Sequence, residues 1–318
     1  MNGNKQTRRE FFKRTGAGAA LAALSPLKPV AASTSTAAGD EPGLVGGATS
    51  CVLAPGSQST GESGKPKSRP LTSPPELIEK LGLASYTTRE LTLTETILWA
   101  KELGLTHLSL KDFHLPLKAT SEQFAQVKDL VKKAGLDFYA VGVIYMKTKD
   151  EVAAAFEYAK NAGVRMIVGV PAHDLVDETE RKIKEVDIAV AIHNHGPSDQ
   201  VYPTCESAFK KIDGRDPRFG LCLDIGHTFR SGEDPADVYK KFHRRILDIH
   251  LKDVDLAEAK GTTVEIGRGK IDIPAFLKTV QGLQYGGNLS FEYEKDGPQP
   301  IPGLAESVGY VRGVIRGL

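Results

Sequence analysis

Eight short apolar runs, each followed by a stretch of helical character, recur from residue 81 to the end of the chain and restrict the folds it can adopt. Such alternation is typical of a parallel sheet whose strands are joined by helical crossovers. The predicted strands are Leu81–Thr87, His107–Lys111, Asp137–Tyr145, Met166–Pro171, Ile188–His195, Gly220–His227, Leu247–Lys252 and Leu289–Glu294.

The segments between these strands contain amphipathic stretches, and eight strand–helix units in about 240 residues have the size of a closed (β/α)8 barrel. A doubly wound open sheet usually carries a glycine-rich phosphate turn after its first strand, but no glycine occurs in Tyr86–Arg89. The sequence therefore predicts an α/β fold, a (β/α)8 TIM barrel over residues 76–318. The predicted helices include Thr94–Leu103, Ser121–Ala134, Glu151–Asn161, Asp177–Val186 and Pro235–Phe242.

The first 32 residues have the organisation of an export signal. Adjacent arginines, Arg8 and Arg9, and an aromatic residue, Phe11, precede the apolar run Gly16–Leu24. This arrangement resembles a twin-arginine signal peptide, and the run is too short to anchor the chain in a bilayer. We therefore expect residues 1–32 to be recognised by the twin-arginine translocase and the protein to be exported to the periplasm or the extracellular space.

Residues 33–75 are rich in Ser, Thr, Gly and Pro without apolar periodicity, which predicts a flexible linker. Of the 41 basic and 40 acidic side chains, six and one lie in the first 32 residues, which leaves 35 and 39 in the rest. A mildly acidic body argues against nucleic acid as a partner. The cysteines Cys51, Cys205 and Cys222 form no recognisable framework, so Cys222 as a core residue and a Cys205–Cys222 disulfide both stay open.

Polar side chains are concentrated at the carboxyl ends of the last four predicted strands, where catalytic groups of a barrel lie. Neutral imidazole together with carboxylates suits one divalent ion such as Mn, Co, Zn, Fe or Mg, with sugar hydroxyls completing the coordination. A hydrogen-bonded polar rim without metal is the alternative. The predicted metal ligands are His193, Asp224, His250 and Glu292.

These strand ends resemble the xylose isomerase-like superfamily of sugar phosphate isomerases and epimerases, which also contains inosose dehydratases and type IV endonucleases. The resemblance covers residues 80–318. It implies one metal ion held from strands 5 to 8, with the last three ligand positions at Asp224, His250 and Glu292, whereas His193 occupies the first position, commonly a glutamate. The blocks that carry it are Ile192–Pro197, Cys222–Pro235, Asp248–Val254, Ile266–Ile273, Phe291–Asp296 and Pro302–Arg312.

The resemblance implies a sugar or polyol isomerase or epimerase that abstracts a carbon-bound proton through a metal-stabilised enediolate. Epimerases of this group are thought to use two metal-bound glutamates on opposite faces of the sugar, and of that pair only Glu292 is present. His193 is nevertheless a competent proton carrier near neutral pH. A metal-dependent lyase, dehydratase or hydrolase of keto-sugars or keto-glycosides on the same site is the alternative.

Each remaining site residue has an expected role. Glu292 or His193 takes the proton, while His195 and His227 orient hydroxyls or donate to the leaving oxygen. Lys252 and Arg268 would neutralise developing negative charge. The alternatives are that Lys252 pairs with a nearby acid and that Arg268 braces its loop. Weaker candidates at the rim are Lys111, His114, Tyr145 and Glu294.

Two other functions compete with a sugar enzyme. A non-catalytic sugar-binding barrel would need the cavity but not the metal ligands. An abasic-site endonuclease gathers more His and Glu ligands and works on intracellular DNA, which the export signal and the acidic body disfavour. We expect a free sugar, a polyol or a glycoside as substrate, and a homo-oligomer is compatible with the sequence.

Overall fold

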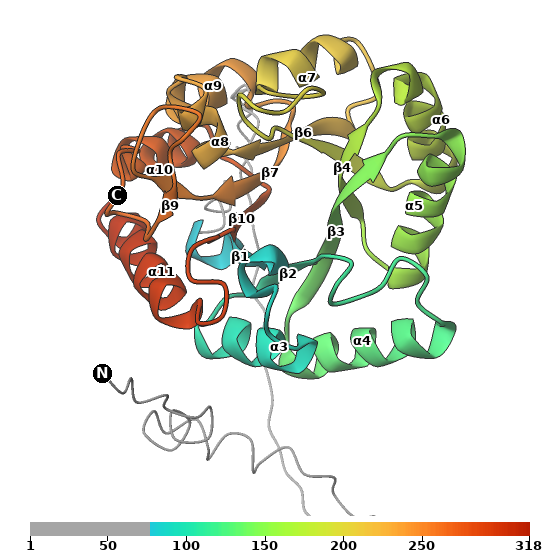
Figure 1. The fold of residues 1–318 in the computed structure, drawn as a ribbon, viewed down its shortest axis with the longest axis horizontal. Helices are drawn as coiled ribbons and strands as arrows, with labels where there is room; N and C mark the ends of the chain where they lie inside the picture. Colours follow the sequence, from blue (N-terminus) through green and yellow to red (C-terminus); the bar gives the residue numbers. More distant parts are fainter. Residues whose placement is uncertain (1–76) are drawn as a thin grey trace, which may run out of the picture. The chain divides into compact units, whose positions relative to one another are not determined.

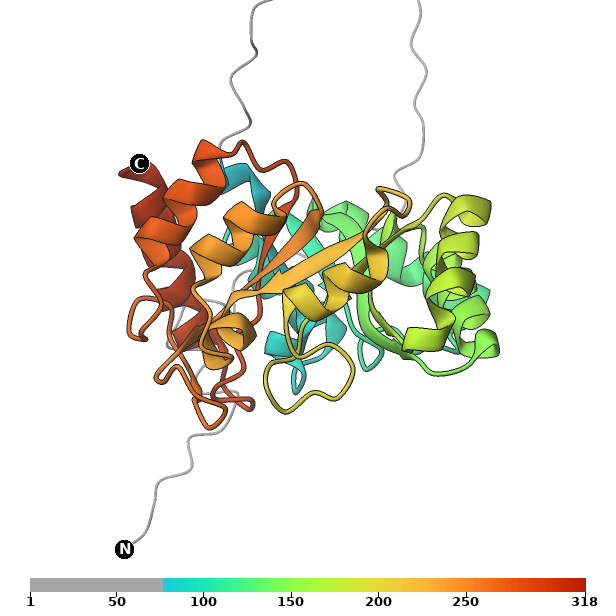
Figure 2. The ribbon, with the colours of Figure 1, turned by 90° about the horizontal axis from the view of Figure 1, so that it is seen from above.

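The computed structural model describes residues 77–318, which form a closed barrel of eight parallel strands with helices around the outside (Figure 1). The strand order around the barrel is β1-β10-β7-β6-β5-β4-β3-β2. The side view shows helices flanking the strands along the barrel wall (Figure 2). The predicted (β/α)8 barrel is confirmed. The predicted signal at residues 1–32, the linker at 33–75 and Cys51 lie outside the described residues.

The barrel strands are β1 (Leu81–Ala84), β2 (His107–Leu110), β3 (Asp137–Met146), β4 (Met166–Pro171), β5 (Ala189–His193), β6 (Phe219–Asp224), β7 (Ile246–Leu251) and β10 (Asn288–Phe291). An antiparallel pair, β8 (Asp253–Val254) and β9 (Thr263–Val264), lies between β7 and the helix that follows. The α-helices are α3 (Leu93–Glu102), α4 (Ser121–Ala134), α5 (Lys149–Ala162), α6 (Val176–Val186), α7 (Cys205–Ile212), α8 (Ile225–Arg230), α9 (Pro235–Phe242), α10 (Ile273–Gly282) and α11 (Ile301–Arg316).

The described residues also form short 3-10 helices, which are η1 (Leu77–Lys80), η2 (Ser85–Thr88) and η3 (His173–Leu175). Among the described helices, none is long and apolar enough to cross a membrane.

Local sequence signals explain several helix ends. Thr92 and Thr120 each form a reciprocal capping box at the start of α3 and α4. Gly135 and Gly163 end α4 and α5 in the left-handed conformation, with φ of 76° and 73°. The predicted helix in the fourth crossover is confirmed as α6.

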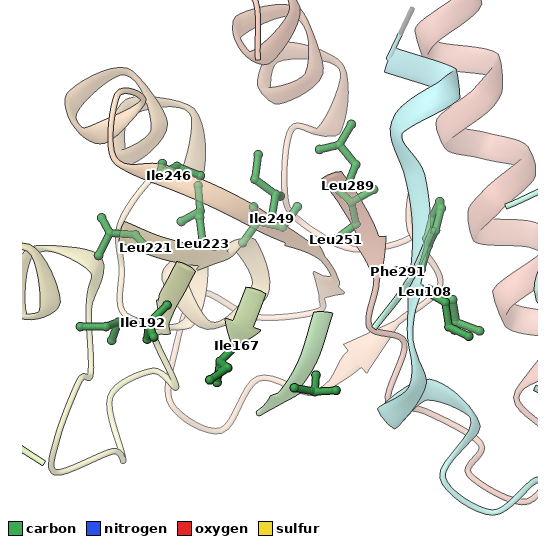
Figure 3. Packing of buried hydrophobic residues seen from close by; sticks show 14 of the residues in the cluster. Leu108, Ile167, Ile192, Leu221, Leu223, Ile246, Ile249, Leu251, Leu289 and Phe291 are labelled. Carbon is green, nitrogen blue, oxygen red and sulfur yellow. The ribbon is translucent and has the colours of Figure 1, made fainter. Parts of the chain in front are cut away.

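The two-residue period of the strands separates a core face from a polar face. Apolar side chains at alternate positions of β6, β7 and β10 belong to one buried cluster that includes helix residues. Figure 3 shows Leu221, Leu223, Ile249, Leu251, Leu289 and Phe291 of this set. The intervening positions, which face the barrel interior, hold Cys222, Asp224, Asp248, His250 and Ser290.

The sixth strand ends earlier than its sequence predicts. The extended run over Gly220–His227 predicted a strand, but β6 ends at Asp224 and α8 begins at the next residue. Asp224 Oδ1 accepts a hydrogen bond from the His227 backbone N–H at 2.7 Å, which caps the new helix. His227 therefore lies on a helix above the barrel and not on a strand.

The cysteines of the described chain are not paired. Cys205 and Cys222 are both free and buried, so the disulfide that the sequence left open is not formed. Cys205 donates through its thiol to Asn194 Oδ1 at 3.4 Å, and Cys222 occupies an interior position of β6.

Asp253, fully buried in β8, organises the segment that follows the seventh barrel strand. Its Oδ1 accepts from the backbone N–H groups of Val254 and Ile271 at 2.9 and 3.2 Å. Its Oδ2 accepts from those of Gly267 and Gly269 at 2.9 and 3.0 Å. A Cβ atom at Gly269 would overlap the carboxylate, so this close approach requires glycine.

Replacing this carboxylate should destabilise the barrel. We expect Asp253→Asn to lower the free energy of unfolding by about 2–3 kcal/mol, because an amide keeps one acceptor and turns donors toward backbone N–H groups. Urea denaturation measures the loss. Asp255→Asn is the matched control, since its bonds to Thr262 are exposed to solvent. Equal losses in the two variants would contradict the assigned role of Asp253.

Candidate metal centre

Four side chains from consecutive barrel strands converge at one point. His193 ends β5, Asp224 ends β6, His250 lies in β7, and Glu292 follows β10 directly. All four are buried, and each offers one ligand atom within 4.8 Å of the others. The structure therefore brings together the four residues that the sequence predicted as ligands.

The spacing of the donor atoms fits one small divalent cation. His193 Nε2 lies 3.2 Å from His250 Nδ1, 3.6 Å from Asp224 Oδ2 and 3.8 Å from Glu292 Oε2. His250 Nδ1 and Glu292 Oε2 are 3.2 Å apart. Metal–ligand bonds of about 2.1 Å place neighbouring ligand atoms roughly 3–4 Å apart. Two imidazole nitrogens and two carboxylate oxygens are also the donor set that Zn, Mn, Co or Fe accepts.

Cys222 forms a second combination of possible ligands with His193 and His250. Burial, together with the carboxylate of Asp248, raises the pKa of the Cys222 thiol well above its ordinary value. Since only a thiolate binds metal strongly, the carboxylates are the better partners of the two imidazoles.

A buried lysine adjoins the cluster. Lys252 Nζ lies 2.9 Å from Asp224 Oδ2, 3.1 Å from Glu292 Oε2 and 2.8 Å from Glu294 Oε1. Burial alone would lower the pKa of Lys252, but these carboxylates outweigh it and hold the pKa well above its ordinary value. In return the ammonium group holds the pKa of Asp224 and of Glu292 low, against the opposing effect of burial.

Backbone and amide contacts fix the orientation of the Asp224 ligand. Its Oδ1 caps α8 by accepting from the His227 N–H, and its Oδ2 is directed toward His193 and Lys252. Asn194, the residue after the first ligand, accepts from the Asp224 N–H at 3.0 Å and donates to its carbonyl at 3.3 Å. The ends of β5 and β6 are thereby tied together.

Two further imidazoles lie next to the four donors. The rings of His195 and His227 have centroids 4.3 and 5.9 Å from that of His193, and 5.8 Å from each other. Burial lowers the pKa of His195 and of His227 to about 3, so both rings are neutral. Tyr145, which is 42% exposed, stacks on His195 at 5.4 Å. These rings provide proton acceptors at the mouth of the barrel.

Beneath the donors, a buried polar network contacts His250 from the other side. Asp248 Oδ2 lies 3.6 Å from His250 Nε2, the ring nitrogen that faces away from the cluster. Tyr139 of β3 donates to Asp248 at 3.0 Å and shares a hydrogen bond with Ser290 at 2.7 Å. Burial raises the pKa of Asp248 to about 6. Burial opposes protonation of His250, but Glu292 outweighs it and raises the pKa of His250 to about 9.

One predicted site residue lies elsewhere. The Arg268 side chain is 65% exposed and pairs with Glu306 of α11, so the structure does not bring it to the cluster. Among the rim candidates, the buried His114 contacts the Leu91 carbonyl at 3.0 Å, and Lys111 donates to the Val143 carbonyl at 3.0 Å. Glu294 joins the site through its bond to Lys252.

Three residues near the cluster were not predicted as site residues from the sequence. Asp248 is two residues from His250, and the strand period could have placed both on one face. Arg230 is three residues beyond His227. This spacing places both side chains on one side of a helix, but the sequence predicted a strand through His227. Tyr139 gives no local signal, since it reaches Asp248 from a strand 109 residues away.

Comparisons with known proteins support the barrel fold. The family model described as xylose isomerase-like TIM barrel matches residues 97–314. Two curated relatives are 29% identical: the rhizopine catabolism protein MocC of Rhizobium meliloti over 151 residues, and an inosose dehydratase of Clostridium perfringens over 143 residues. These matches cover 43% and 40% of this chain and 46% of each relative, so the chain matches about half the length of either.

Among solved structures, the IolI protein with a bound zinc atom superposes with a TM-score of 0.63 at 17% identity. That superposition covers 75% of this chain and 98% of the other. At this level of identity the likeness shows the shared fold.

The network beneath His250 should affect metal affinity. A carboxylate beside the second nitrogen of a metal-binding histidine orients the ring and increases its basicity. We expect Asp248→Asn to weaken zinc binding by about 10–100-fold, measured by competition with a chelating dye. Tyr139→Phe, which keeps the carboxylate, should change affinity much less. A folded Asp248→Asn protein with unchanged affinity would refute this role.

Proposed function

Since the chain belongs to the xylose isomerase-like TIM barrel family, we propose that it is a divalent-metal-dependent lyase that removes water or another leaving group from a keto-sugar or keto-polyol. The curated relatives named inosose dehydratase support this lyase chemistry better than the isomerase or epimerase activity expected first from the sequence. We also propose, from the twin-arginine motif alone, that it acts outside the cytoplasm.

One observation carries the choice of reaction: the donor supplied by β5 is the His193 imidazole and not a carboxylate. Glu292 is then the only glutamate among the four donors, so the site lacks the two opposed glutamates expected of an epimerase. Elimination needs one group that accepts a proton from carbon and one that delivers a proton to the leaving oxygen. A neutral imidazole next to the donor cluster can accept the proton, and the imidazolium formed in that step can deliver it.

In this proposal His193, Asp224, His250 and Glu292 hold the cation. A divalent cation supplies Lewis acidity, which polarises a carbonyl group and stabilises negative charge on its oxygen. His195 or His227 accepts the proton from the carbon next to the carbonyl, and the same proton returns to the β-hydroxyl, which leaves as water. Lys252 keeps its proton and offsets part of the negative charge of Asp224 and Glu292.

The reaction can be tested with inosose, the substrate class in the relatives' name. We expect the metal-loaded protein to convert inosose to a product lighter by one water, seen by mass spectrometry and NMR in D2O. Removal of the metal with EDTA should abolish the conversion, and Mn, Co or Zn should restore it. Deuterium exchange without loss of water would instead indicate isomerase or epimerase chemistry. Absence of both exchange and product across a panel of keto-sugars and keto-glycosides would refute the proposal.

The proton carrier can be separated from the metal ligands. We expect His195→Gln to lower kcat by about 10²–10⁴-fold while zinc affinity stays within a few-fold, because His195 transfers a proton and does not ligate. Tyr145→Phe removes only the hydroxyl 3.4 Å from that ring and should retain most activity. If His195→Gln keeps full activity, His227→Gln tests the other imidazole.

A further inference from the structure

A pocket lies beside the metal centre. It has a volume of about 370 Å³ and is lined by Arg230, Gly261, Thr262, Thr263, Val264, Glu294 and Lys295. Glu294 connects the two sites, since its carboxylate accepts from Lys252 at 2.8 Å. Lys252 and Glu294 therefore link the four donors to the wall of this pocket.

Arg230 reaches the pocket from the same helix that carries His227. Asp224, His227 and Arg230 follow at intervals of three residues, so they lie along one side of α8. The Arg230 guanidinium lies 3.4 Å from His227 Nδ1 and donates to the Ala259 carbonyl at 2.6 Å. Its Nε is buried without a hydrogen-bond partner. Among the described residues, no carboxylate forms an ion pair with it.

The other charged side chains that line this pocket each have a partner of opposite charge. Lys295 pairs with Glu265 at 2.8 Å, and Glu294 pairs with Lys252. With a divalent cation at the centre, Lys252 and the cation together balance the three carboxylates of Asp224, Glu292 and Glu294. The positive charge of Arg230 is left over. A half-buried guanidinium normally has an anionic partner, which in this pocket the ligand can supply.

We infer that Arg230 binds an anionic oxygen group of the substrate, a carboxylate or a phosphate monoester. The substrate class is then an acidic derivative of a sugar or polyol, with its carbonyl at the metal centre and its anion at Arg230. The location of the carbonyl and the charge balance rest on the proposed function, whereas the unpaired guanidinium and its buried Nε do not. A planar guanidinium recognises either group through paired N–H donors.

Binding of three probes tests this inference: D-glucuronate, D-glucose 6-phosphate and D-glucose, titrated into metal-free and zinc-loaded protein. We expect at least one anionic probe to bind about tenfold or more tightly than glucose. The probe that binds better distinguishes carboxylate from phosphate. Arg230→Gln should remove the preference, and Arg230→Lys should restore part of it. Lys260→Gln is the matched control, because it removes the same charge from an exposed residue paired with Glu258.

Equal affinity for all three probes, or a preference that persists in Arg230→Gln, would overturn the inference. Zinc titration of the same samples separates it from the proposed function. Normal zinc binding without an anion preference would refute the anion site alone. An anion preference in protein that binds no zinc would refute the metal centre and leave the anion site standing.

Discussion

The arrangement of this barrel mouth depends on the buried ammonium group of Lys252. Asp224 and Glu292 bring two negative charges into a region that excludes water, and such charges are tolerated only beside positive ones. Lys252 lies within about 3 Å of both and also of Glu294. It thereby permits carboxylates to approach the two imidazoles closely enough to share an ion. The histidine at position 193 fits the same requirement, because it supplies a ligand atom without adding to the negative charge of the three carboxylates that Lys252 contacts.

Much of the fold and all four donor residues could be predicted from the sequence, since both follow from the two-residue period of the strands. Alternation of apolar and polar residues in β6, β7 and β10 places Leu221, Ile249 and Leu289 in the core cluster and the polar side chains inside. Because parallel strands end at one rim, residues far apart in sequence could be assigned to a common site. The structure does not bring Arg268 to the cluster, because a position after a strand does not determine the partner of a long side chain. Arg268 instead pairs with Glu306 on α11, in agreement with the alternative that it braces its loop.

What the sequence did not reveal depends on single side-chain contacts. The alternation of residues that predicted a strand through His227 does not predict that Asp224 caps a helix. The cap is one hydrogen bond to a backbone N–H. That boundary determines where His227 and Arg230 lie. The contact from Tyr139 to Asp248 crosses the barrel interior, so it depends on closure of the whole sheet and on no local pattern.

The cap on α8 also relates the metal centre to the pocket beyond it. One carboxylate does two tasks: Asp224 Oδ1 begins the helix, and Oδ2 faces the other donors. The Arg230 guanidinium lies 3.4 Å from His227 Nδ1, so the inferred anion site lies beside one of the proposed proton carriers. A ligand that uses both sites therefore needs a carbonyl and an anionic group in one molecule, and a small neutral carbonyl compound has only the first.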